Sequence, residues 1–199
     1  MQTYTVLRVT SGGEVVLFEG HVRRLGEASR EAVRSFGQAA VPGIYRVTWD
    51  GRAVQAEARG ASRLVEGMPV RLVVSPYVDQ RGRFAKPAPP SGYDAVRVAG
   101  VATLLTDAPG REVYESCSAS VVAWDGEVVV LPPEDAPGVA SVAEAAVVAR
   151  VPHRRARVLV TEPWPWVLIN AVVGTCGIVV PGRPGFPPHV RAWLDDALK

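Results

Sequence analysis

Lysine is nearly absent from this chain of 199 residues. The sequence contains 20 arginines but only two lysines, Lys86 and Lys199. Because Lys199 is the last residue, Lys86 is the only lysine that a folded interior could hold. Enzymes that form a Schiff base need a lysine amine beside the cofactor or substrate, so any such chemistry here must use Lys86. The alternative is that high-GC coding has replaced lysine by arginine and that Lys86 is an ordinary surface residue.

Long apolar runs and paired cysteines are also missing. The most apolar stretch, 167–180, is interrupted by Asn170 and two glycines, so we expect a buried strand, a turn and a second strand, not a membrane span. The first residues show neither the basic nor the apolar region of a signal peptide, which favours a cytoplasmic protein without a membrane partner. Cys117 and Cys176 are isolated, so we expect neither a metal site nor a disulfide framework.

The chain carries no strong excess of charge of either sign. Its net charge is +2 and its apolar fraction is 48%, which is ordinary for a globular protein that buries a sizeable core. Arginines are interleaved with acids, so no nucleic-acid partner is expected. We interpret the one dense basic run, 153–157, as a solvated turn or the start of a strand, with a phosphate or nucleic-acid contact as the alternative.

Residue patterns predict a small α+β domain over residues 1–75. Glycines at positions 12 and 13 indicate a hairpin between its first two strands, and Asp50-Gly51 indicates a second hairpin. From Gly20 apolar residues recur at helical spacing, and Gly37 is expected to end that helix. The expected strands are 4–9, 15–18, 44–49, 53–57 and 70–75.

A stretch rich in proline and glycine, 76–92, is the expected linker to a larger α+β domain, 93–199. A helix is predicted after Pro137-Gly138, and a short amphipathic helix is predicted over 189–198. The expected strands of this domain are 102–106, 113–115, 120–124, 127–131, 157–160 and 167–170. The predicted fold is therefore α+β in two domains, a small meander-plus-helix domain and a larger, mostly antiparallel sheet or barrel-like domain.

Four motifs occur in an order that resembles a known family. They are the strand Thr5–Val9 followed by His21-Val22-Arg23-Arg24-Leu25, then Leu104-Leu105-Thr106-Asp107 followed by Glu115, then Pro137–Ser141, and finally the Gly174–Pro181 turn and strand. This order resembles the class IV aminotransferases, the fold-type-IV pyridoxal-phosphate (PLP) enzymes. That family includes branched-chain and D-amino-acid aminotransferases and aminodeoxychorismate lyase.

The resemblance implies a role for each matching residue. Lys86 would form the aldimine with PLP and then move the proton, with Tyr93 near the position of a family tyrosine. Glu115 would hold the protonated pyridine nitrogen. A phosphate monoester needs a guanidinium and N–H donors at a helix N-terminus. The phosphate ligands implied here are the Arg24 side chain, the N–H groups of Val139 and Ala140, and the hydroxyl of Thr175. His21 is interpreted as a structural histidine.

The sequence leaves two functions open. The first is a PLP-dependent aminotransferase or lyase that acts on an amino acid or an amino-chorismate-like substrate, assembled as a homodimer like the family. The second is a non-catalytic protein of the same fold that binds a small molecule or a partner without PLP. Departures from the family pattern keep the second function open: the family's first strand is missing, Ser120 replaces an asparagine, and Ser141 replaces an arginine.

Overall fold

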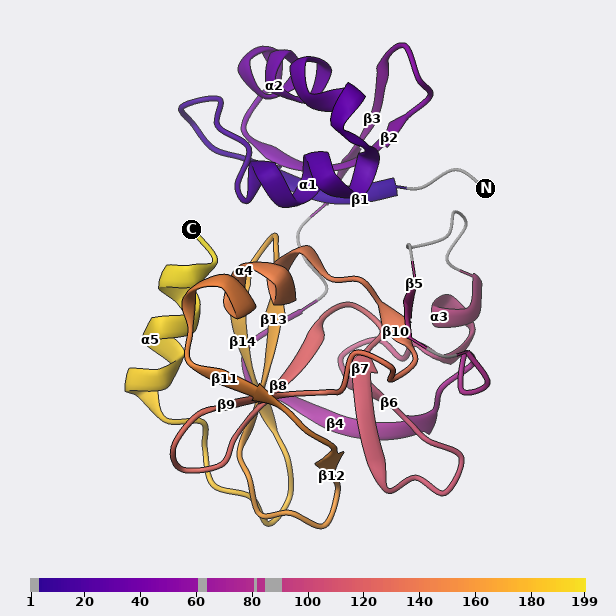
Figure 1. Ribbon diagram of the computed structural model, residues 1–199, viewed down its shortest axis with the longest axis vertical. Helices are drawn as coiled ribbons and strands as arrows, with labels where there is room; N and C mark the ends of the chain where they lie inside the picture. The colour runs from indigo at the N-terminus through magenta and orange to yellow at the C-terminus, as the bar shows by residue number, and fades with distance from the viewer. Residues whose placement is uncertain (1–3, 61–63, 81, 85–90) are drawn as a thin grey trace.

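The described part of the protein contains a three-stranded sheet, a curled nine-stranded sheet and a two-stranded sheet (Figure 1). The computed structural model describes residues 4–60, 64–80, 82–84 and 91–199. Helices accompany both sheets, which confirms the predicted α+β class. Within the described residues, no helix has the length and apolar character needed to span a membrane.

The smaller sheet is antiparallel and has a helix packed on it. The strand order is β1 (Tyr4–Val9), β2 (Gly43–Trp49) and β3 (Val54–Arg59). Its core joins Val33 of α2 (Arg30–Ala39) to Leu7, Val9 and Val47 of the strands. The hairpin predicted at Asp50-Gly51 connects β2 and β3, and Asp50 Oδ1 accepts the N–H groups of Arg52 and Ala53.

Two predictions for this unit are wrong. The segment 15–18 is not a strand, because Leu17 adopts a left-handed conformation (φ 54°) and α1 (Phe18–Leu25) begins directly after it. Only Val15 bridges to β1. The single helix expected from Gly20 to Gly37 is two helices, since Gly26 (φ 103°) ends α1 and a short 3₁₀ turn, η1 (Glu27–Ser29), precedes α2.

The larger sheet contains all of the remaining predicted strands. Most of its pairs are antiparallel, but β4 is parallel to both of its neighbours, and β11 is parallel to β9. The strand predicted at 70–75 is β4, so its partners lie in this sheet and the three-stranded sheet ends at Arg59. The order is β11 (His153–Arg155), β9 (Val129–Leu131), β8 (Ser120–Trp124), β13 (Trp166–Asn170), β14 (Gly174–Val179), β4 (Met68–Val74), β6 (Ala102–Thr106), β7 (Glu112–Ser116), β12 (Val158–Leu159).

Part of the predicted linker 76–92 has regular structure. Within it, β5 (Arg83–Phe84) pairs in parallel with β10 (Gly138–Val139), and α3 (Ser91–Val96) begins at its end. Lys86 lies outside the described residues.

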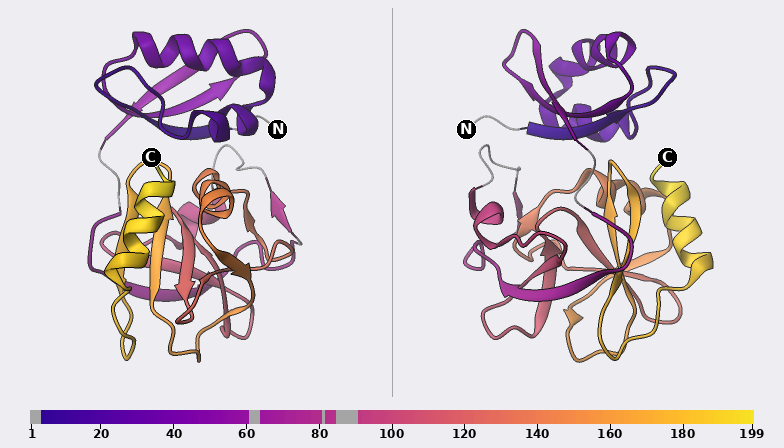
Figure 2. Two further views of the ribbon diagram at one scale, coloured as in Figure 1. Left: turned by 60° about the vertical axis from the view of Figure 1, so that its left-hand side comes forward. Right: turned by 180° about the vertical axis from the view of Figure 1, so that it is seen from behind.

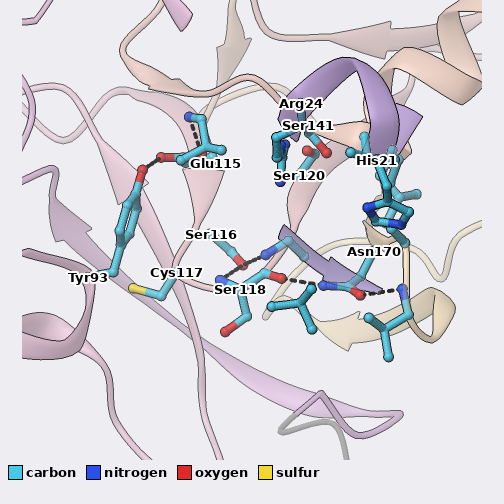
Figure 3. A pocket seen from close by; sticks show the side chains of 18 residues that line it. His21, Arg24, Tyr93, Glu115, Ser116, Cys117, Ser118, Ser120, Ser141 and Asn170 are labelled. Carbon is cyan, nitrogen blue, oxygen red and sulfur yellow. Dashed lines mark hydrogen bonds between the residues drawn. The ribbon is translucent and has the colours of Figure 1, made fainter. Parts of the chain in front are cut away.

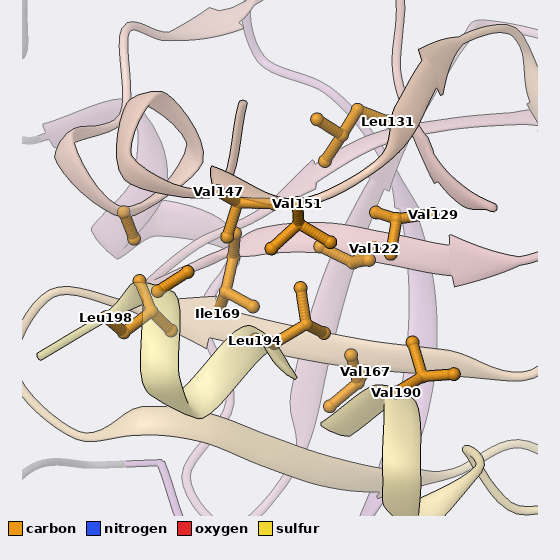
Figure 4. Packing of buried hydrophobic residues seen from close by; sticks show 12 residues of the cluster. Val122, Val129, Leu131, Val147, Val151, Val167, Ile169, Val190, Leu194 and Leu198 are labelled. Carbon is orange, nitrogen blue, oxygen red and sulfur yellow. The ribbon is translucent and has the colours of Figure 1, made fainter. Parts of the chain in front are cut away.

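Helices α4 (Val142–Arg150) and α5 (Pro188–Ala197) cover one face of the curled sheet. Figure 4 shows this layer, in which Val147 of α4 and Leu194 of α5 meet Val122, Val167 and Ile169 of the strands. All five side chains are fully buried. Burial of an aliphatic side chain contributes about 1.5–3 kcal/mol, so this layer accounts for much of the stability of the larger unit.

An ion pair fastens α5 to the segment that precedes β4. The Arg191 guanidinium donates to both carboxylate oxygens of Glu66 at 2.6 and 2.8 Å, and Glu66 also accepts the Gly177 N–H at 2.9 Å. Arg191 Nε donates to Thr175 Oγ1 at 2.8 Å. This network joins the segment before β4, the strand β14 and the last helix.

The two units meet through contacts between α1 and α4. Figure 2 shows the smaller unit lying against one end of the larger unit in both views. The helices approach closely at Gly20, where an added Cβ atom would lie 2.6 Å from Cγ1 of Val142. Real Cβ atoms do not come so close to a neighbour, so Gly20 is required by packing between the helices.

We predict that Gly20→Ala lowers the free energy of unfolding by about 1–2 kcal/mol. The steric clash with Val142 destabilises the folded state by more than the higher helix propensity of alanine stabilises it. In a Val142→Ala background the same change should be neutral or stabilising. Urea denaturation of the four proteins of this cycle measures the coupling. Gly60→Ala, in open space, is the control. Equal effects of Gly20→Ala in both backgrounds would show that packing against Val142 does not require a glycine at position 20.

Candidate functional site

A cavity lies between the two sheets and is lined by residues of both (Figure 3). The smaller unit contributes Val6 of β1 and His21 and Arg24 of α1. The larger unit contributes Tyr93, Glu115, Val139 and three segments, 116–120, 141–143 and 169–172. The site therefore depends on the contact between α1 and α4.

Glu115 is a nearly buried carboxylate at the edge of this cavity, with 5% of its surface exposed. Its Oε1 accepts the Tyr93 hydroxyl, and its Oε2 accepts the Val139 N–H at 3.0 Å. A buried carboxylate is stable only when its oxygens are hydrogen-bonded. These two donors therefore fix its position between β7, α3 and β10.

A β-bulge determines which way Glu115 points. Glu115 pairs with Leu105, but the register shifts at the next step, so Val113 pairs with Thr106. Val113 consequently packs in the core with Leu104, whereas Glu115 lies on the opposite face of β7 with Leu105. Without the bulge, residues two apart would share a face.

Tyr93 acts as a neutral donor toward Glu115. Burial raises the pKa of the Tyr93 hydroxyl, and the neighbouring Glu115 carboxylate raises it further. The hydroxyl therefore keeps its proton throughout the physiological range. Its ring also contacts Tyr77, with the ring centroids 5.0 Å apart. This position makes Tyr93 a positioning residue for the carboxylate.

Arg24 brings a positive charge to the other side of the cavity. Its Nη2 donates to the carbonyl oxygen of Ala140, just before the start of α4. Burial lowers the pKa of the Arg24 guanidinium to about 10, with the partly opposing influence of Tyr4, so the group remains charged at neutral pH.

The N-terminus of α4 faces the same cavity. Ser141 is the N-cap residue, and its hydroxyl oxygen accepts the Glu144 N–H at 3.2 Å. The first N–H groups of an α-helix have no acceptor within the helix. Val142 and Ala143, which line the cavity, supply such groups beside Arg24. Backbone donors, a helix dipole and a guanidinium together form a setting suited to an anion.

The remaining wall is built from polar turns. Ser116 Oγ accepts the N–H groups of Ser118 and Ala119 at 3.2 and 3.1 Å. Asn170 donates from Nδ2 to the Ser118 carbonyl at 2.5 Å and accepts the Val172 N–H at 2.8 Å. Asn170 thus ties the β13–β14 turn to the turn after β7.

His21 lines the cavity as a neutral imidazole. It is fully buried, and its Nδ1 lies 2.6 Å from the hydroxyl oxygen of Thr5, which is also fully buried. Burial, and then the positive charge of Arg24, lower the pKa of His21 to about 3. A protonated imidazole is therefore incompatible with this position near neutral pH.

The structure brings together some of the sequence-predicted site residues and separates others. Arg24, Tyr93, Glu115 and Val139 line one cavity, although the Val139 N–H is directed to Glu115. Two predicted phosphate ligands, Ala140 and Thr175, are not among the lining residues. Ala140 is exposed and offers its carbonyl to Arg24, Thr175 donates from its N–H and hydroxyl to Asp195 of α5, and Lys86 lies outside the described residues.

Sequence reasoning missed the donors at positions 142 and 143. The pattern Ser141-Val-Ala-Glu144 is a capping-box sequence, and it would have placed the helix start at Ser141. In the sequence, Asn170 is recognisable only as an interruption of an apolar run. No local signal indicates that its side chain bridges two turns.

We predict that His21 makes stability fall as the pH is lowered. An unfolded histidine takes up a proton below about pH 6.5, whereas folded His21 does so only near pH 3, so acid favours the unfolded chain between these values. From pH 7 to pH 5 this linkage costs about 2 kcal/mol. Urea denaturation at several pH values measures how the free energy of unfolding changes with pH. This dependence should be weaker in His21→Gln and unchanged in the control His189→Gln. Parallel slopes for all three proteins would contradict this assignment.

Comparison with solved structures identifies the fold. The chain is similar to a 4-amino-4-deoxychorismate lyase from Pseudomonas aeruginosa, with 17% identity, a TM-score of 0.70, and coverage of 99% of this chain and 89% of that one. It is also similar to the PLP-bound form of a hypothetical aminotransferase from Mycobacterium tuberculosis, with 18% identity, a TM-score of 0.69, and coverage of 99% and 88%. A fold IV transaminase from Curtobacterium pusillum gives 16% identity, a TM-score of 0.67, and coverage of 99% and 85%.

No protein-family model and no curated protein matches the sequence. The chain therefore has the fold of these solved proteins, as the resemblance in its motifs predicted.

Proposed function

We propose that this protein is a PLP-dependent enzyme, an aminotransferase or a lyase acting on an amino acid or an amino-chorismate-like substrate. The observation that carries the proposal is that one cavity has a negative charge on one side and a positive charge on the other. Glu115 is a buried carboxylate on one side, and Arg24 stands with the N-terminus of α4 on the other. The shared fold with the PLP-bound aminotransferase supports the same conclusion.

The described residues fit this cofactor at both of its charged ends. Glu115 would hold the proton on the pyridine nitrogen, and Tyr93 would keep Glu115 oriented by donating its hydroxyl proton to Oε1. Arg24 and the N–H groups of Val142 and Ala143 would hold the phosphate. When bound, PLP supplies an electron sink for reaction at the α-carbon of an amino substrate.

Lys86 is our candidate for covalent attachment and for proton transfer at the substrate's α-carbon. The only other lysine is Lys199, which is exposed and pairs with Asp196 on α5. A lysine amine acts as a base only when a nearby positive charge or burial lowers its pKa.

One observation favours the second candidate, a non-catalytic protein of this fold. Arg24 donates to the Ala140 carbonyl, and the Val139 N–H is used by Glu115. These donors are therefore engaged within the chain and must be released or supplemented before they hold a phosphate. In this reading the cavity binds a small molecule without PLP.

A PLP titration decides between the two candidates. We predict a visible absorption band on addition of PLP, and one modified peptide containing Lys86 after borohydride reduction. Lys86→Ala should abolish the band, and Lys199→Ala is the matched control that should retain it. A wild-type spectrum that stays flat at saturating PLP would exclude the enzymatic function.

Glu115→Gln tests the pyridine contact separately. The neutral amide keeps the shape of the side chain but removes the charge that stabilises a protonated ring nitrogen. We predict that the visible band persists while the rate of half-transamination falls by roughly 10²-fold, the usual effect of losing one buried electrostatic contact. Stopped-flow absorbance measures this rate. An unchanged rate would show that Glu115 has no role in the reaction.

We also propose that the protein is a cytoplasmic homodimer. The two cysteines are buried and unpaired, as expected for a reducing compartment. Leu72 and Val74 lie on the same face of β4 and are 39% and 44% exposed, so a second copy of the chain could bury them.

Light scattering should give the dimer mass at micromolar concentration. Leu72→Glu should shift that mass to the monomer, because it places a charge in the interface. Arg71→Glu changes the neighbouring residue, on the other face of β4, and is the control. A monomeric wild-type protein would contradict the proposed assembly.

A further inference from the structure

A second hollow, the α1–α4 groove, is lined mainly by residues of these two helices. Its volume is about 780 Å³, within the range of roughly 300–1,000 Å³ that is typical of small-molecule sites. Arg24, Ser141 and Val142 line both this groove and the central cavity between the two units. These three residues therefore form the wall between the two hollows, and a molecule in the groove lies outside the proposed active site.

The apolar floor of the groove is the uncovered side of α4. Apart from one glutamate and one arginine, this helix consists of alanine and valine. A helix that is apolar all round is normally covered on every side. Among the described residues, however, Ala145 and Ala149 are exposed and Val148 is half-buried. Together with Val142 they form an apolar stripe about 10 Å long, as given by the rise of a helix over seven residues.

Two arginines of α1 bring positive charge to this groove. The Arg24 guanidinium donates to the Ala140 carbonyl, a neutral acceptor just before the start of α4. Arg23 is exposed, and its side chain makes no hydrogen bond or ion pair within the described part of the chain. The acid one turn earlier on α1, Glu19, is already held by Arg30 at 2.6 and 2.8 Å. Neither arginine therefore has a carboxylate of its own.

The two carboxylates that line the groove are engaged elsewhere. Arg155 pairs with Glu134 at 3.3 Å and with Glu144 at 2.7 Å. The side chain of Glu134 is 79% exposed, so water screens its charge. The groove thus has three guanidiniums against two carboxylates, and the N-terminus of α4 adds a partial positive charge. An anion placed at Arg23 and Arg24 meets a net positive charge.

We propose that the α1–α4 groove binds a medium-chain aliphatic carboxylate, such as octanoate, as an effector and not as a substrate. The carboxylate would lie on Arg23 and Arg24, and the chain would cover the apolar stripe of α4. Two observations support this class of ligand, the surplus of guanidinium groups and the elongated apolar floor beside them.

Arg24 links the groove to the central cavity. This link rests on the proposed function, which assigns Arg24 to the phosphate of PLP. An anion in the groove and a phosphate in the cavity would share one guanidinium and repel each other. Each should therefore weaken the binding of the other by the same factor.

Calorimetric titration of the full chain without PLP tests the groove directly. The probes are octanoate, its neutral amide octanamide, and acetate, which lacks the chain. We expect octanoate to bind about 10-fold or more tightly than either other probe, because it alone has both the charge and the chain. Arg23→Gln should remove the preference for the acid over the amide. Arg34→Gln, which changes an exposed arginine of α2 paired with Glu31, should retain it.

Ala145→Glu tests the apolar stripe. The new carboxylate would occupy the path of the chain and repel the acid, so octanoate affinity should fall by about 10-fold or more. Ala192→Glu, at an exposed alanine of α5, is the matched control and should bind like the wild type. Light scattering on Ala145→Glu identifies a different occupant. A change from dimer to monomer would show that a second copy of the chain covers α4, and would overturn the inference.

The link through Arg24 is measured from the visible band of bound PLP. Saturating octanoate should raise the dissociation constant of PLP by roughly fivefold or more, and this shift should disappear in Arg23→Gln. An unchanged PLP affinity would overturn the link.

Three results separate the groove from other sites. Equal binding of octanoate and octanamide, or unchanged binding in Arg23→Gln, would overturn the groove assignment. So would binding that is lost in Arg24→Gln but retained in Arg23→Gln, since that result places the acid in the central cavity. If PLP gives no visible band but octanoate still binds through Arg23, the proposed function fails and the groove assignment stands.

Discussion

The burial of one carboxylate constrains the whole site. Glu115 is almost excluded from water, and a buried carboxylate without donors would destabilise the fold by several kcal/mol. Tyr93 and the Val139 N–H supply those donors from two segments that are distant in sequence. The positions of α3 and β10 against β7 follow from this requirement. The bulge in β7 also helps Glu115 to reach its donors, because it places Glu115 on the face of the strand opposite to the core residue Val113.

The second constraint is the close approach of two helices. Gly20 lets α1 lie against Val142 at the start of α4, and this contact places Arg24 over the Ala140 carbonyl. The two sides of the cavity therefore belong to different units of the protein. The cavity holds both charges only while the two units are packed together, so the chemistry of the site depends on that packing.

Much of the fold could be predicted from local patterns, and particular failures show why the rest could not. Alternation over β2 and the Asp50-Gly51 turn identify a hairpin without tertiary information. The four residues 15–18 are apolar in a way that suits either strand or helix, and the left-handed Leu17 decides the outcome. For the site, Arg24 and Glu115 converge as expected, whereas Thr175 is drawn to Asp195 by the packing of α5, which no local pattern reveals.

The strand order has a consequence for synthesis of the chain on the ribosome. The three-stranded sheet is complete at Arg59, so it can form early and from nearby segments. By contrast, β4 lies between β14 and β6, with Met68 paired to Ile178, and Glu66 is held by Arg191 of the last helix. Contacts between such distant residues form slowly. The nascent chain can pair β4 with β6 early, but the other edge of β4, at Met68 and Pro69, stays unpaired until Ile178 and Val179 have emerged. During this interval the open edge of β4 can pair with other chains or be bound by chaperones.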